Sequence, residues 1–179
     1  MNEEWRLDTL VHLGLWLLIA AASVGVRILP LSHAEGGWPR PDLLLVLTMA
    51  WILRRPAHIP ALAVALVFLT EDLFLMRPPG LWTLAVLAGT EFLRRRQTVV
   101  REMNLALEWA MVAAVLVAMT LAARFGLAIV MVPRDPLGLS LGRLAVTILI
   151  YPLVVWFLQG VLQVRKPATG EVDERGRRL

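Results

Sequence analysis

The sequence predicts an all-α integral membrane protein, a six-helix transmembrane bundle in which two of the spans are short. Apolar residues make up 58% of the 179 residues and the mean hydropathy is +0.68, whereas soluble domains are usually about 45–50% apolar. Charged residues, 18% of the chain, cluster between long uncharged runs. These runs are continuous rather than alternating. Because a bilayer requires every backbone polar group to be satisfied internally, helices are favoured over barrel strands.

Six apolar segments form the predicted spans of a single transmembrane domain, residues 1–164. Four of them reach the roughly 20 residues that a hydrocarbon core about 30 Å thick requires: 10–31, 57–76, 104–133 and 139–164. The other two, 40–53 and 80–93, contain shorter apolar stretches. They would cross by borrowing flanking residues and thinning the bilayer, or would be re-entrant. Arginines at the end of each short segment mark a cytoplasmic boundary, which favours six spans over four.

The distribution of basic residues predicts that both termini lie in the cytoplasm. With six spans, twelve Arg and Lys residues fall in the loops and tails on the side of the termini, against three on the other side, as the positive-inside rule requires. With four spans the count becomes eleven against four. The first apolar run is expected to be retained rather than cleaved as a signal, because acidic residues outnumber basic ones before it. Residues 165–179 are expected to be a disordered cytoplasmic tail.

Six ionisable residues within or beside the spans are expected at one depth, near the membrane face away from the termini. They are Arg27, Asp42, Glu71, Asp72, Arg124 and Arg143. Charge inside a bilayer is costly and usually faces a bundle interior, a cavity or a partner, so one interpretation is a buried polar layer or a partner-docking surface. The alternative is that the arginines extend to nearby headgroups. The short Asp72 side chain favours a buried role, and a proton or ion relay through Glu71 and Asp72 stays open.

Two further features concern packing between the spans. Glu91 and Glu108 lie near cytoplasmic ends of their segments, where pairing with Arg94 or Arg95 is expected. Pro152 lies in the middle of the last span. A proline there removes one backbone hydrogen bond and usually kinks the helix, although packing against neighbouring helices also accommodates many membrane prolines.

No reactive arrangement is evident in the sequence. Cysteine is absent, which excludes disulfides and thiolate sites. His12, His33 and His58 stand singly, without a second ligand at metal-binding spacing, so no metal site is expected. We expect no catalytic residue and no cofactor. Nucleic-acid binding is not expected either, since basic loops of membrane proteins commonly face anionic lipid headgroups.

Several short motifs resemble those of the bacterial rod shape-determining protein MreD family. The stretch Arg40-Pro41-Asp42, followed by an apolar run, Trp51 and then Pro56, is similar to the signature of the second segment in that family. The later landmarks have the matching order and are Asp72, Gly80 and the pair Tyr151-Pro152 before a basic tail. Together these motifs cover about residues 5–165.

The resemblance implies a non-catalytic inner-membrane subunit of the cell-elongation machinery, involved in peptidoglycan synthesis and cell-shape control. Such a subunit would bind a single-pass MreC-like protein. Through it, the subunit would join MreB filaments, the RodA glycosyltransferase and a class B penicillin-binding transpeptidase. The resemblance also implies a six-helix fold similar to the substrate-binding subunits of energy-coupling-factor transporters. That similarity leaves open an alternative function as a small-molecule binding or transport subunit.

Overall fold

The computed structural model describes residues 2–28, 40–132 and 136–162, and their regular structure is helical throughout. The helices are α1 (Asn2–Ile28), α2 (Leu43–Arg54), the 3₁₀ turn η1 (Pro56–His58), α3 (Ala61–Phe74), α4 (Leu81–Arg95), α5 (Gln97–Glu102), α6 (Leu105–Ile129) and α7 (Leu137–Gly160). The predicted tail 165–179, the last residues of three predicted spans (29–31, 133 and 163–164) and His33 lie outside the described residues.

Three helices identify the chain as a helical membrane protein. The stretch Leu7–Arg27 of α1, together with α6 and α7, is long and apolar enough to cross a bilayer. Large apolar side chains on these helices are exposed, including Leu18 at 68% and Leu149 at 68%. Exposure of this kind suits a hydrocarbon solvent, because lipid chains replace water around the apolar side chains.

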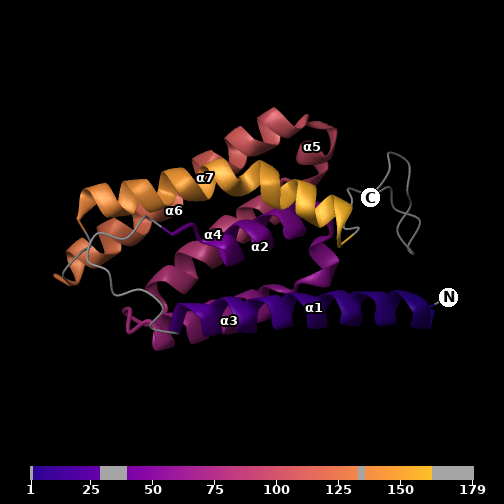
Figure 1. Ribbon diagram of the computed structural model, residues 1–179, viewed down its shortest axis with the longest axis horizontal. Coiled ribbons are helices and arrows are strands. Elements are labelled where there is room, and N and C mark those ends of the chain that lie inside the picture. The colour runs from indigo at the N-terminus through magenta and orange to yellow at the C-terminus, as the bar shows by residue number, and fades with distance from the viewer. Residues whose placement is uncertain (1, 29–39, 133–135, 163–179) are drawn as a thin grey trace.

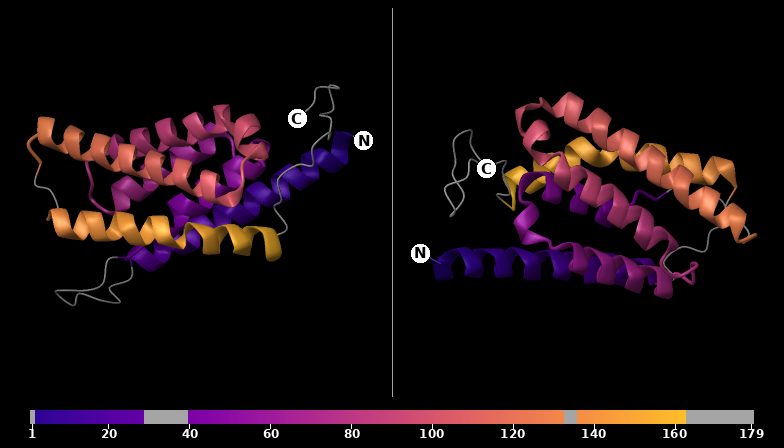
Figure 2. Two further views of the ribbon diagram at one scale, coloured as in Figure 1. Left: turned by 90° about the horizontal axis from the view of Figure 1, so that it is seen from above. Right: turned by 180° about the vertical axis from the view of Figure 1, so that it is seen from behind.

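The longer helices stack as three pairs, each in contact with the next (Figure 1). The pair α1 and α3 contacts the central pair α2 and α4, which in turn contacts α7 and α6. Figure 2 shows the same arrangement from above and from behind. Consecutive long helices run in opposite directions, so the start of α1 and the end of α7 lie at one end of the molecule, here named the near end. The opposite end, which holds the start of α2 and the end of α6, is named the far end.

Helix α2 is the buried centre of the structure. Every residue from Leu44 to Arg54 is buried, and the helix packs against α7, α4 and α1. A helix that is apolar all round is enclosed by other helices. The shortness of this segment therefore reflects a position in which α2 faces protein rather than lipid.

The observed boundaries differ from the predicted ones mainly at the near end. The segment predicted to begin at residue 57 starts with η1, and α3 begins only at Ala61, after Pro60. The short helix α5 occupies the predicted loop after residue 93. Helix α4 also packs tightly against α6 at Gly89, where the sulfur of Met119 in α6 would lie 2.4 Å from an added Cβ. The Met119 side chain of α6 thus fills the space beside this glycine, and a larger residue at position 89 would have to displace it.

Pro152 does not interrupt α7, because a neighbouring helix supplies the missing hydrogen bond. A proline has no N–H, so the carbonyl four residues earlier, that of Ile148, loses its helical donor. The indole Nε1–H of Trp109 in α6 donates to this oxygen at 2.8 Å, and α7 continues to Gly160. Helix α7 therefore continues through Pro152, because α6 supplies the hydrogen-bond donor that the proline lacks.

This arrangement predicts a specific coupling between Trp109 and Pro152. Trp109→Phe should lower the free energy of unfolding by about 1–3 kcal/mol, because it leaves the Ile148 carbonyl without a donor. In a Pro152→Ala background the alanine N–H restores the helical bond, so the same Trp109→Phe change should cost clearly less. Unfolding titrations of the four proteins in mixed micelles would measure the difference. Equal losses in both backgrounds would contradict this account.

Candidate functional site

A cluster of ionised side chains at the far end joins α1, α2 and α3. Arg27, near the end of α1, donates from Nη2 to Asp42 Oδ1 at 2.6 Å and from Nη1 to Glu71 Oε1. Glu71 is fully buried, and Arg77 Nη1 lies 3.8 Å from its Oε1. Each charge thus has an oppositely charged neighbour, which offsets the cost of burial in a medium of low dielectric constant. We name Arg27, Asp42, Glu71 and Arg77 the far-end cluster.

Asp42 has a second role, as the N-cap of α2. Its Oδ1 accepts the backbone N–H of Leu45 at 3.1 Å. Its own backbone N–H donates to Thr147 Oγ1 of α7, also at 3.1 Å. One residue therefore satisfies a free donor at the start of α2 and connects that helix to α1 and α7.

Asp72 is buried beside Glu71 but is directed to the turn between α3 and α4. Its Oδ2 accepts the backbone N–H of Gly80 at 3.2 Å, the backbone N–H of Thr83 at 3.1 Å and the Thr83 hydroxyl at 2.8 Å. Gly80 has a φ of 88°, a left-handed conformation that favours glycine. The position of the Asp72 and Gly80 landmarks is thus explained by the shape of this turn.

Arg124 and Arg143 lie at the same end, beside a pocket rather than in the ion-paired cluster. Arg124 donates to the Ser140 hydroxyl at 2.7 Å, which links α6 to α7. The pocket has a volume of about 170 Å³ and opens between α2, α4, α6 and α7. Its lining combines polar and apolar side chains: Asp42, Leu45, Arg77, Pro78, Leu81, Trp82, Leu116, Thr120, Ala123, Arg124, Leu127, Ser140, Arg143, Leu144 and Thr147.

A second buried ion pair lies at the near end and corrects the prediction for Glu108. Arg54, the last residue of α2, is fully buried with its Nη1 3.0 Å from Glu108 Oε1. Tyr151 of α7 donates its hydroxyl to the same oxygen. Glu108 therefore pairs with Arg54 rather than with Arg94 or Arg95, because its side chain faces the buried α2. We name Arg54, Glu108 and Tyr151 the near-end triad.

Arg94 is a bridge between α4 and η1. It pairs with Glu91 at 2.8 Å, as expected. Its guanidinium also donates to the backbone carbonyls of Pro56 and Ile59. These carbonyls lie in the irregular segment between α2 and α3, where helical donors are absent, so an arginine side chain takes their place.

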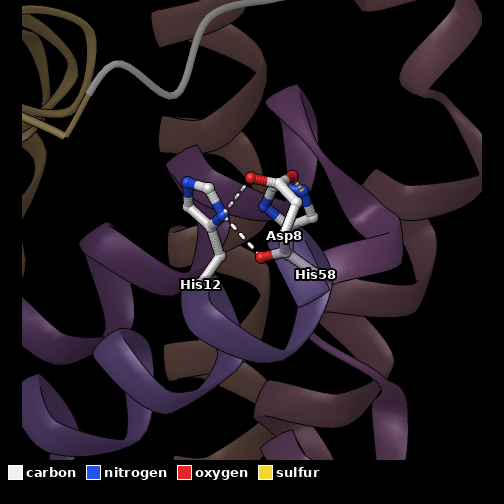
Figure 3. A group of neighbouring side chains, drawn as sticks. All are labelled: Asp8, His12 and His58. Carbon is white, nitrogen blue, oxygen red and sulfur yellow. Dashed lines mark hydrogen bonds and ion pairs between the residues drawn. The ribbon is translucent and has the colours of Figure 1, made fainter. Parts of the chain in front are cut away.

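The prediction that the histidines stand singly is wrong for His12 and His58. Figure 3 shows the His12 ring facing Asp8 and His58. His12 Nδ1 is 2.8 Å from the carbonyl oxygen of Asp8 and 3.1 Å from its Oδ1. His58 Nε2 is 3.4 Å from Asp8 Oδ2, and the two rings stack with centroids 4.4 Å apart. Asp8 and His12 are four residues apart on one helix, a spacing that places side chains together and that could have indicated the cluster.

These three residues could hold a divalent metal ion, since one ligand atom from each lies within 4.8 Å of the others. The hydrogen bonds favour another role. Trp51 donates its indole N–H to His58 Nδ1 at 3.4 Å, which leaves the proton of that ring on Nε2, facing Asp8. His12 Nδ1 likewise faces a carbonyl acceptor, so a metal ion would displace both protons. The cluster is arranged as a hydrogen-bonded bridge from α1 to η1.

The protonation state of His58 is consistent with a hydrogen-bonded bridge from α1 to η1. Burial, followed by repulsion from His12, lowers the pKa of His58 to about 4. At neutral pH its imidazole is therefore uncharged. A neutral ring donates one hydrogen bond and accepts one, which matches the partners Asp8 and Trp51.

The other motif positions are structural or peripheral. Trp51 is completely buried in α2, and Pro56 is the first residue of η1, where a missing N–H costs nothing. Arg40 is exposed and Pro41 is partly buried before α2. Sequence reasoning missed Arg54 and Arg77 as members of buried clusters, because both follow apolar runs and were assigned to loops.

Comparison with known proteins does not assign the chain to a family. No protein-family model matches the chain, and searches of curated proteins and of solved structures give no match.

The near-end triad predicts that its two charges depend on each other. Arg54→Leu should cost about 3–5 kcal/mol of unfolding free energy, because it removes the buried guanidinium that lies 3.0 Å from the Glu108 carboxylate. Adding Glu108→Gln removes that charge and keeps an acceptor for Tyr151, so the double variant should recover most of the loss. Unfolding in mixed micelles measures both effects. Arg95→Leu is the control at the same end, since Arg95 is exposed. A double variant as unstable as Arg54→Leu would refute the coupling.

Proposed function

We propose that the chain is a non-catalytic subunit of the bacterial cell-elongation machinery in the inner membrane, of the MreD type, and that it binds a single-pass MreC-like protein. One observation carries the proposal. The landmarks of the resemblance, although distant in sequence, occupy the junctions that join the helices. Asp42 connects α1, α2 and α7, Asp72 organises the turn into α4, and Tyr151 completes the near-end triad.

The hydrogen bonds and ion pairs of these residues favour a scaffold function over an enzymatic one. The acidic side chains at the landmarks accept hydrogen bonds or ion pairs from neighbouring helices, so their chemistry contributes to holding the helices in place. A general acid or base would instead need access to a substrate proton. Buried, internally paired charges suit a rigid membrane body that presents its outer surfaces to partners.

The outer face of α1 supports a partner that spans the membrane once. Of the three long apolar helices, α1 is the least enclosed by the rest of the protein. Within its most apolar stretch 17% is buried, against 22% for α6 and 28% for α7. Leu10, Val11 and Leu18 are each more than 60% exposed on it. Within a bilayer, a transmembrane helix of an MreC-like protein can pack against such a face through van der Waals contacts.

The proposal includes six spans with both termini in the cytoplasm. The alternating directions of the longer helices support it. So does the arginine content of the near-end connections, which hold Arg55, Arg95 and Arg96 among the described residues.

Depleting the protein in its rod-shaped host should convert rods into round cells, because elongation of the cell wall would lose a subunit. Re-expression of the wild-type chain should restore the rods, and cell dimensions in the microscope are the measurement. A tagged chain should also co-purify with the MreC-like protein. Rods that persist after complete depletion, with no such protein recovered, would exclude this function.

Reporter fusions test the orientation separately. A reporter active only outside the cytoplasm should be inactive when fused after Arg96 and active when fused after Met131, because Arg96 follows α4, Met131 follows α6, and these two helices end at opposite ends of the structure (Figure 1). Each site should be paired with a cytoplasm-active reporter, which should give the reverse pattern. An external signal at Arg96 would invert or abolish the proposed topology.

A further inference from the structure

The face of α1 that is turned away from the other helices has a regular order of apolar and small residues. Trp16, Ala20 and Val24 face the rest of the protein and are buried. On the opposite side, exposed residues recur at alternating intervals of four and three positions. We name this row the α1 seam: Leu7, Val11, Gly14, Leu18, Ala21 and Gly25. An average spacing of 3.5 residues keeps such a row in contact with a second helix that crosses at a small angle.

Two members of the α1 seam are glycines that packing within the protein does not require. No atom of the described residues lies within 4 Å of a Cβ added at Gly14 or at Gly25. A glycine inside a helix lowers the stability of that helix. In membrane helices, small residues allow a second helix to come close, which increases the van der Waals contact between the two. The two open glycines, about 17 Å apart along the helix axis, therefore favour a helix as the neighbour of this face.

The near end of the same face is acidic. Glu3 and Glu4 precede Leu7 by about one turn of α1, so helical periodicity places both positions in line with the α1 seam. Arg6 directly precedes Leu7 and falls about 100° away from it around the helix axis. Under the proposed topology the near end is cytoplasmic, where basic residues are usual. The acidic start of α1 departs from that rule and favours a partner with the opposite charge.

This charge distinguishes between the possible occupants of the α1 seam. Two copies of the chain have the same orientation in one membrane, so a pair of α1 helices would bring the Glu3 and Glu4 positions of both copies together, which is unfavourable. The anionic headgroups of the cytoplasmic leaflet would also be repelled. A single-pass protein usually carries Lys or Arg at the cytoplasmic end of its span, which is the complementary charge. The segment before α6 would repel the same partner, because it carries the exposed Arg95 and Arg96.

We propose that the α1 seam binds the transmembrane helix of a single-pass protein whose cytoplasmic flank is basic. The two helices cross at about +20°, and larger apolar side chains of the partner lie over Gly14 and Gly25. The basic flank of the partner lies beside Glu3 and Glu4. From Leu7 to Gly25 the seam extends about 27 Å, nearly the thickness of the hydrocarbon core. The inference rests on the proposed function, since it takes the near end as cytoplasmic and the MreC-like protein as the partner.

Site-specific photocrosslinking in the rod-shaped host tests the location. Benzoylphenylalanine in place of Leu18 should crosslink the tagged MreC-like protein. The same probe in place of Leu121 of α6 or Leu149 of α7, which are similarly exposed, should give little product. As much product from either control as from Leu18, or a product from Leu18 that joins only two copies of this chain, would overturn the assignment. No product from Leu18 overturns it too. In that case the proposed function stands if the two proteins still co-purify, and fails as well if they do not.

Binding of the two purified full-length proteins in a neutral detergent tests the glycines. Gly14→Leu and Gly25→Leu should each weaken binding by about tenfold or more, because the added side chain displaces the partner helix. The unfolding temperature of the chain alone should not fall, since an added Cβ at either position meets no atom of the described residues. Gly138→Leu in α7 is the matched control, because that glycine is equally open, and it should leave the affinity within about twofold. An equal loss for Gly138→Leu, or no loss for the two seam variants, would contradict the proposal.

Charge reversal tests the acidic end in the same binding measurement. The double change Glu3→Lys and Glu4→Lys should weaken binding by about threefold or more, as expected for two exposed ion pairs. Replacing the basic residues of the partner's flank by Glu should restore the affinity. Glu102→Lys in α5 is the control, an exposed change of the same sign at the same end, and should leave the affinity within about twofold. A loss that the charge-reversed partner does not restore would refute pairing at this end.

Discussion

The structure depends on how the charges at the two ends of α2 are neutralised. Asp42 at its start pairs with Arg27 of α1, and Arg54 at its end pairs with Glu108 of α6. Between them lies an almost uninterrupted apolar sequence that is buried on every side. Because a lone charge in such surroundings would cost several kcal/mol, both pairs must form for α2 to occupy the centre of the molecule.

The same pairs determine how α2 is positioned. An apolar helix in an apolar environment gains nearly the same contact energy after a small shift or rotation, so packing alone specifies its position poorly. A buried polar contact penalises such shifts, as single polar residues do in coiled coils. The Thr48 hydroxyl, which accepts the indole N–H of Trp16 at 3.1 Å, adds a third polar contact between the two ends.

The sequence predicted part of this arrangement well. The membrane class follows from hydropathy, and counting 1.5 Å per residue along alternating segments places Arg27, Asp42 and Glu71 at a common depth. The structure brings them within ion-pairing distance.

The near-end contacts could not be predicted by counting residues along the segments. An arginine after an apolar run has the same sequence pattern whether it faces water, like Arg95, or a buried carboxylate, like Arg54. Only the packing of α2 distinguishes them. The bridge of Asp8 to His58 likewise joins residues whose proximity depends on the fold of η1.

The enclosure of α2 has a consequence for biogenesis. Its twelve residues extend about 18 Å, well short of a hydrocarbon core about 30 Å thick, and each end carries an ionised group. During synthesis such a segment gains little by partitioning into lipid alone. Arg27, which precedes it in the chain, and Glu108, which follows it, pair with these two groups, so we expect stable integration of α2 to require the later helices.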